Sequence, residues 1–117
     1  MNKTLEEFGK TLISDVRDRT IRNIDSIVIG KMKDYSSQEM YKKISCMDIN
    51  QKELINQLIS MTVDFTLHNF LEMFESHEDI QLIINNQNLN QLSDGLAGEL
   101  YTEDGWIQKY TKQRYTE

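Results

Sequence analysis

The residue pattern closest to a reactive site lies in the middle of the chain, where Asp64, His68 and Glu72 are spaced four apart and Glu75 follows. On a helix this spacing places the four side chains along one stripe. Such ligands build di-iron sites in helical bundles, but those sites need Glu-x-x-His pairs on two helices and further glutamates from two more. No second segment offers such a set, so the pattern favours a polar seam. A small metal-dependent helical enzyme or sensor is the alternative.

The other reactive residue types do not form a recognisable catalytic set. His77 lies at the expected end of the same helix, where an imidazole caps the helix or is solvated. The single cysteine, Cys46, lacks activating neighbours, so we expect it to fill the core. The sequence contains neither a phosphate-binding glycine loop nor the Gly-x-Ser-x-Gly elbow of hydrolases. We therefore expect a protein that is not an enzyme and that has no metal or other cofactor.

Charge is distributed unevenly along the chain, whose formal net charge is −6. Residues 1–50 carry nine Lys or Arg and eight Asp or Glu, whereas residues 51–117 carry four and eleven. No Lys or Arg occurs between Glu53 and Gln108. An acidic surface steers association with positively charged partners, although acids also promote solubility alone. Binding to nucleic acid is disfavoured, because phosphate neutralisation needs a basic face.

The arginines of the first half do not supply such a basic face. Three arginines alternate with three aspartates along one segment: Asp15, Arg17, Asp18, Arg19, Arg22 and Asp25. Acids that lie four residues before a base stabilise a helix by about 0.2–0.5 kcal/mol per pair. The pattern therefore predicts a solvated, self-paired face of the first helix.

Aromatic residues mix with acids near the end of the chain. Tyr101 and Trp106, the only tryptophan, lie among four carboxylates with no base before Lys109. An aromatic anchor surrounded by charge is typical of a binding hot spot; alternatively, Trp106 holds the last helix on the core. The candidate partner-binding residues are Glu75, Glu78, Asp79, Asp94, Glu99, Tyr101, Glu103, Asp104 and Trp106.

Two long helices must position these residues, and the absence of proline permits them. The first is expected over residues 4–33, where Gly30 ends or bends it. Its apolar side is formed by Leu5, Phe8, Leu12, Ile13, Val16, Ile24, Ile27 and Val28. The second is expected over residues 49–76, with Asp48 and Gln51 as a capping box.

The second long helix is apolar over nearly its whole circumference. One side carries Leu54, Ile55, Leu58, Ile59, Met61 and Phe65, and most of the remainder carries Val63, Leu67, Phe70, Leu71, Met73 and Phe74. A helix of this kind is usually surrounded by others, and the apolar excess also admits a homodimer or a self-associating adaptor. At 1.5 Å per residue it spans about 42 Å, so its tip projects or it bends.

Short elements complete the expected all-α architecture, a compact helical bundle with three or four short helices. One helix is expected from Ser36, which has capping-box spacing to Glu39, to about Cys46. For residues 80–84 we expect a helix in preference to a strand. Residues 85–91 are expected to form a loop, and short helices are expected over residues 92–101 and 106–110. The tail from about residue 111 is expected to fray.

Length and composition bound the class of protein. A chain of 117 residues forms one domain, here residues 1–117. A single cysteine excludes an internal disulfide framework and indicates a reducing compartment. The acidic N-terminus does not resemble a signal peptide, and no apolar stretch of about 18 residues is present. We therefore expect a cytoplasmic protein that does not enter a membrane.

The small, acidic, helical chain resembles in type the immunity proteins that bacteria make against their own toxins, including those of contact-dependent inhibition systems. The resemblance rests on size, on the base-free stretch from Glu53 to Gln108 and on the acidic run around Trp106. It implies a non-enzymatic protein that neutralises a basic partner by covering the active site of a nuclease-type toxin with an acidic face. It implies no particular fold and no particular binding residues.

Overall fold

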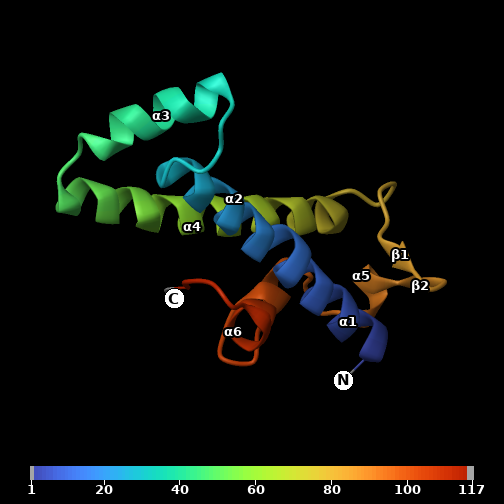
Figure 1. The fold of residues 1–117 in the computed structure, drawn as a ribbon. Helices are drawn as coiled ribbons and strands as arrows, with labels where there is room; N and C mark the ends of the chain where they lie inside the picture. Colours follow the sequence, from blue (N-terminus) through green and yellow to red (C-terminus); the bar gives the residue numbers. More distant parts are fainter. Residues whose placement is uncertain (1, 116–117) are drawn as a thin grey trace.

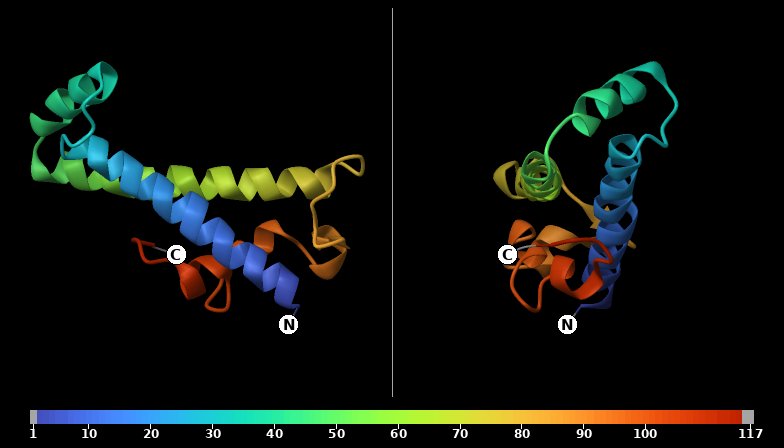
Figure 2. Two further views of the ribbon diagram at one scale, coloured as in Figure 1. Left: turned by 45° about the vertical axis from the view of Figure 1, so that its right-hand side comes forward. Right: turned by 60° about the vertical axis from the view of Figure 1, so that its left-hand side comes forward.

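The computed structural model describes residues 2–115 and is mostly helical (Figure 1). This confirms the all-α class in its coarse form. The molecule is drawn out along its longest helix, with extents of 49 × 29 × 22 Å. The N-terminal helical rod crosses that helix diagonally, and the short C-terminal elements fill the angle between the two (Figure 2).

The first long helix is a continuous rod made of three segments. They are α1 (Lys3–Thr11), the π-helical η1 (Leu12–Asp18) and α2 (Arg19–Val28). The rod ends before residue 33 because Gly30 adopts a φ of 83°, which favours glycine. The Lys31 amide then donates to the Ser26 carbonyl at 2.8 Å, which closes the helix end.

The π-helical segment changes which side chains face inward. A π turn holds an additional residue, so positions after it are rotated relative to a regular α-helix. Arg17 and Asp18 are consequently buried, with exposures of 0% and 2%, whereas Val16 is 44% exposed. The prediction that these two charged residues lie on a solvated outer face is wrong, and so is the inward placement of Val16.

A second helix, α3 (Tyr35–Ser45), begins one residue before the expected capping residue. Its N-cap is Asp34, whose carboxylate accepts from the Ser37 amide at 3.1 Å. Hydrogen bonds from Ser37 lower the pKa of Asp34. Cys46 at the other end is exposed, and its thiol donates to the Lys42 carbonyl at 3.3 Å. The expectation that Cys46 fills the core is therefore wrong.

The central helix, α4 (Ile49–Ser76), has the expected bounds. Asp48 accepts from the Gln51 amide at 2.9 Å, and the Gln51 side chain accepts from the Asp48 amide at 3.0 Å. The predicted capping box is confirmed. Because the cap satisfies two amides that would otherwise lack partners, it fixes where the helix begins.

Replacing Asp48 by alanine is expected to destabilise the fold by about 1 kcal/mol, since it removes the acceptor of an N-terminal amide. The measurement is the free energy of unfolding in urea. Asp48→Ser is the matched control, because it keeps a capping oxygen and should cost much less. Equal stability of the alanine variant and the wild type would show that the cap contributes nothing.

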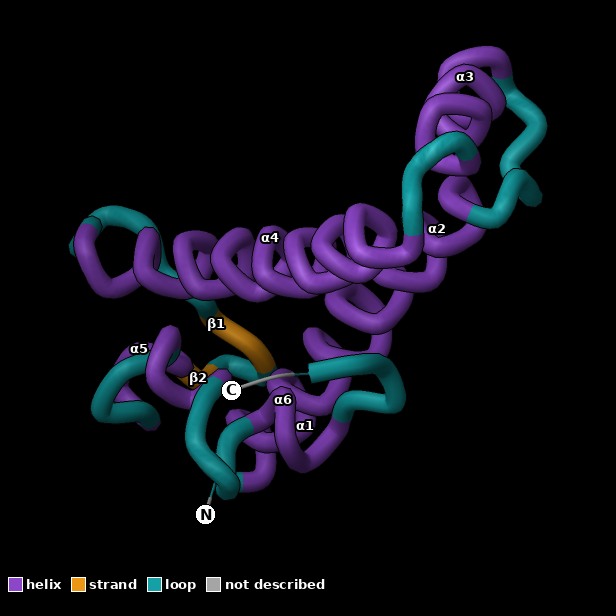
Figure 3. The backbone as a smooth tube through the Cα atoms, turned by 90° about the vertical axis from the view of Figure 1, so that its left-hand side faces the viewer, coloured by secondary structure: helices purple, strands orange, loops and turns teal. Residues whose placement is uncertain are grey.

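Only one side of α4 is covered by the rest of the chain. Val63, Leu67 and Leu71 are buried against the core. The opposite side is open, and its exposed apolar residues are Leu54, Leu58, Met61 and Phe65. The expectation that other helices surround α4 is therefore wrong for this side within residues 2–115. The short C-terminal elements lie along one side of α4, and α3 rises beyond its N-terminal end (Figure 3).

After α4 the chain forms a small hairpin rather than the expected helix over residues 80–84. Strands β1 (Ile83–Ile84) and β2 (Gln87–Asn88) pair antiparallel. Between them Asn85 and Asn86 have φ values of 53° and 64°, the left-handed conformation of a two-residue hairpin turn. Asparagine tolerates this conformation better than most residues, so the turn prevails over the helix.

The remaining elements are short. They are α5 (Leu89–Leu92), the 3₁₀ helix η2 (Ala97–Leu100) and α6 (Trp106–Tyr110). The expected helix over residues 92–101 is thus replaced by the last residue of α5, a turn and η2. The buried cluster joins these elements to the long helices through Leu5, Leu12, Ile13, Leu67, Leu71, Leu89, Leu96, Ala97, Leu100, Trp106 and Ile107.

The C-terminal segment is anchored on the buried charges of η1. The Arg17 guanidinium donates to Thr111 Oγ1 and to the Arg114 carbonyl, both at 2.9 Å. The Lys112 amide donates to Asp18 Oδ2 at 2.8 Å. The expected fraying is therefore wrong for residues 111–115, and residues 116 and 117 lie outside the described part of the chain.

Candidate functional site

The polar stripe of α4 is divided among separate structural contacts. Arg17 Nε donates to Asp64 Oδ1 at 2.6 Å. His68 Nδ1 lies 3.2 Å from the Tyr101 hydroxyl, and Glu72 accepts from the Ser76 hydroxyl at 3.4 Å. Across residues 2–115, no three His, Cys, Asp or Glu side chains are arranged to hold a metal ion. Asp64, His68 and Glu72 thus each contact a different partner within the protein, as the polar-stripe interpretation of this pattern predicts.

Trp106 belongs to the buried core. Its exposure is 1%, and its indole nitrogen donates to Glu6 Oε2 at 3.0 Å. Phe8 packs edge-on against the ring, with the centroids 5.9 Å apart. Of the two interpretations of this residue, the geometry favours the one in which it holds α6 on the core.

Tyr101 is partly accessible and remains available to a partner. Its ring lies 5.8 Å from that of His68. Burial, followed by the charges of Asp64 and Tyr115, raises the pKa of Tyr101. The phenol is therefore neutral at physiological pH and can both donate and accept hydrogen bonds.

Four of the candidate acids gather around the C-terminal end of α4 in what we call the acidic hollow. Glu75, Glu78 and Asp94 line a depression of about 510 Å³ between the end of α4 and residues 88–94. A neighbouring depression of about 450 Å³ shares Asp94 and adds Glu99. Neither depression has a Lys or Arg in its lining. The hollow thus concentrates negative charge at a concave surface.

Two of these acids also hold the hollow in shape. Glu75 accepts a hydrogen bond from the Leu96 amide, and Glu99 accepts from the Ser93 hydroxyl at 2.8 Å. Within residues 2–115, the carboxylates of Glu78 and Asp94 make no hydrogen bond or ion pair. Both carboxylate oxygens of Glu78 and of Asp94 can therefore pair with a positively charged group of a partner.

The other candidate acids lie outside the hollow. Asp79 is exposed in the turn that follows α4, and it does not line either depression. Glu103 and Asp104 are exposed in the turn before α6. The structure therefore brings together Glu75, Glu78, Asp94 and Glu99, and leaves these three acids on separate turns.

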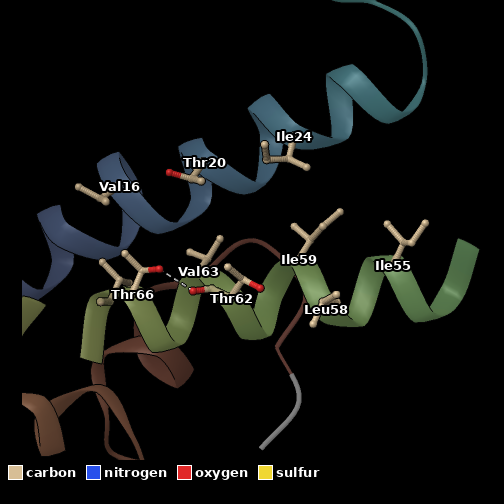
Figure 4. A pocket seen from close by; sticks show the side chains of 10 residues that line it. Val16, Thr20, Ile24, Ile55, Leu58, Ile59, Thr62, Val63 and Thr66 are labelled. Carbon is tan, nitrogen blue, oxygen red and sulfur yellow. Dashed lines mark hydrogen bonds between the residues drawn. The ribbon is translucent and has the colours of Figure 1, made fainter. Parts of the chain in front are cut away.

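A third depression, which the sequence did not indicate, is an apolar groove between the N-terminal rod and α4 (Figure 4). Its volume is about 380 Å³. It is lined by Val16, Thr20, Ile24, Ile55, Leu58, Ile59, Thr62, Val63, Thr66 and Leu67. The π-helical segment that leaves Val16 exposed in this groove has no signature in residue spacing, so the groove could not be predicted from the sequence.

No helix in the described part of the chain combines the length and the apolar character needed to cross a membrane. The chain gives no significant match to any protein-family model, curated protein or solved structure.

Proposed function

We propose that this chain is a non-enzymatic binding protein whose acidic hollow receives a basic segment of a protein partner and thereby blocks that partner. The observation that carries the proposal is the convergence of Glu75, Glu78, Asp94 and Glu99 around two adjoining depressions lined by no base. A concave surface lined by one sign of charge focuses the field and accelerates encounter with the opposite charge. This is the behaviour of an inhibitor that must reach its target quickly.

A basic nuclease-type toxin is the partner class that fits this proposal best. Such an enzyme carries Lys and Arg residues to bind nucleic acid phosphates, and the same residues would enter an acidic hollow. The resemblance in type to toxin-immunity proteins points to the same class and to a cytoplasmic location. The charge of the acidic hollow should make the association rate depend on salt concentration. Packing of the partner on Tyr101, the accessible aromatic residue among the candidates, should set the dissociation rate.

The first experiment is capture of partners by the tagged chain from its own source cells, with washes at low and then high salt. A single basic partner retained at low salt and lost at high salt is expected. The double variant Glu78→Lys with Asp94→Lys should weaken its binding by about 100-fold or more, because like charges facing across an interface cost several kcal/mol. The readout is the dissociation constant, together with the partner's activity in the presence of each variant.

The matched control is Glu7→Lys with Asp15→Lys, which changes net charge equally at exposed acids of the first helix. It should bind within a few-fold of the wild type. A third variant, Glu103→Lys with Asp104→Lys, places the same change in the turn before α6 and locates any contribution from that turn. Equal losses in all three variants would mean that only net charge matters, which contradicts a defined acidic hollow.

A further inference from the structure

The open side of α4 carries a seam of apolar residues with coiled-coil spacing. Leu54, Leu58, Met61 and Phe65 follow one another at intervals of four, three and four residues. This is the alternation of a and d positions in a heptad repeat, which keeps one seam facing a partner helix. Their exposures are 66%, 60%, 52% and 60%, so residues 2–115 leave them uncovered.

The seam continues into the apolar groove. Leu58 belongs to both, and it lines the groove together with Ile55 and Val16 (Figure 4). Large contiguous apolar patches on a soluble protein mark interaction sites. An interface of standard size buries about 800 Å² on each side. Such an area requires most of α4 and the edge of the groove.

We propose that a second copy of this chain covers the seam, with the two α4 helices antiparallel about a two-fold axis. The seam is self-complementary in this orientation. Leu54 of one copy meets Phe65 of the other, and Leu58 meets Met61. Polar residues bound the seam at its two ends, namely Gln51 and His68, and His68 also contacts Tyr101 of its own chain. A two-fold interface pairs one patch with itself, and this pattern meets that condition.

Charge favours a second copy over a basic helix at this face. The uncharged polar residues beside the seam on α4 are Asn50, Gln57, Thr62 and Asn69. Asp64, which also flanks the seam, is paired with Arg17, and Glu72 lies one heptad beyond Phe65 at the C-terminal end. The two Glu72 residues of an antiparallel pair lie at opposite ends, so two acidic chains meet here without facing carboxylates, while a basic partner would find Glu72 alone at one end of the seam.

Charge also selects the antiparallel orientation. The C-terminal turns of α4 carry Glu72 and Glu75 and no base, whereas its N-terminal turns carry Lys52 beside Glu53. An antiparallel pair brings each wholly acidic end toward the end of the other copy that holds a base. A parallel pair would align acidic ends with each other, which is unfavourable.

The test measures mass in solution by sedimentation equilibrium over a wide range of concentration. The wild type is expected to reach twice the 13.8 kDa of one chain. The variant Leu58→Glu with Met61→Glu should raise the dimer dissociation constant by about 100-fold or more, since it places like charges across the seam. Its circular dichroism should match that of the wild type, because both side chains are already exposed.

The matched control is Ile29→Glu with Ile83→Glu, which adds the same charge at exposed apolar residues outside α4. It should dimerise like the wild type. A wild-type chain that stays at 13.8 kDa throughout overturns the proposal and assigns the seam to a helix of another protein. A seam variant that dimerises as well as the control also overturns it.

The native Cys46 reports the orientation, because it is exposed and is the only cysteine. A spin label there lies near the N-terminal end of α4 in each copy. The antiparallel register separates the two labels by about 40 Å, at 1.5 Å per residue. A parallel pair would bring them to about 10–20 Å, given helix axes 8–10 Å apart. A short distance in the dimer overturns the antiparallel arrangement.

Discussion

Replacing Trp106 by alanine is expected to lower the free energy of unfolding by about 3–5 kcal/mol, the range for truncating a buried aromatic side chain. The indole is 1% exposed and contacts the rod at Gly9, where a β-carbon would lie 2.3 Å from the ring. Its removal leaves a large cavity and also takes the hydrogen-bond donor away from Glu6. The measurement is denaturant unfolding monitored by circular dichroism.

Tyr35→Ala is the control, since Tyr35 is 80% exposed and its loss should change stability by less than about 0.5 kcal/mol. A second pair of variants tests the same contact from the other side. Gly9→Ala should destabilise because the indole must move, whereas Gly98→Ala should not, because nothing lies within 4 Å of its added carbon. Similar stability of these two glycine variants would contradict the close packing of Trp106 on the rod.

Replacing Arg17 by methionine is expected to cost about 3–5 kcal/mol, because it strands buried acids without their counter-charge. The guanidinium is completely buried, lies 3.6 Å from Asp18 and donates to both carboxylate oxygens of Asp64. Arg17 also binds the C-terminal segment through Thr111. Arg17→Lys should recover only part of the loss, since an ammonium group cannot reproduce the planar set of donors.

The matched control is Arg19→Met, which removes an exposed arginine two residues along the same rod. Its effect should stay within about 0.5 kcal/mol. Limited proteolysis gives an independent readout, because the C-terminal segment should become sensitive in Arg17→Met and remain protected in Arg19→Met. If Arg17→Met were as stable as the wild type, the buried ion pairs would contribute nothing to the fold.

Local signals explain which parts of the fold could be predicted from sequence. Asp48 and Gln51 define the start of α4 through contacts between residues three apart, and Gly30 defines the end of the rod through its own backbone conformation. Both depend on neighbours in sequence, so the pattern of residue types is sufficient. The apolar excess of α4, by contrast, predicted a helix surrounded by others and left self-association as an alternative, and it did not show which side the chain leaves open.

The features that could not be predicted depend on contacts between distant segments. Arg17 lies in a segment where arginines alternate with aspartates, which indicated a solvated face, and the π-helical turn and the acceptors on α4 and the tail explain its burial. The sequence listed the acids of the hollow as candidate partner-binding residues, but it did not show which of them lie close together. Glu75 and Asp94 come together because the Asn85–Asn86 turn folds the chain back beside the end of α4.

The anchoring of the tail on the first helix has a consequence for biosynthesis. Arg17 and Asp18 bind residues that are 93 to 97 positions later in the chain, and Glu6 binds Trp106 across 100 positions. During translation the N-terminal rod therefore keeps an empty indole site, and Asp18 lacks its acceptor contacts to the tail, until residues 106–112 have left the ribosome. Cotranslational folding can form the helices earlier, but the closing step must wait for this segment, and a chain truncated before residue 106 is a natural substrate for chaperones and proteases.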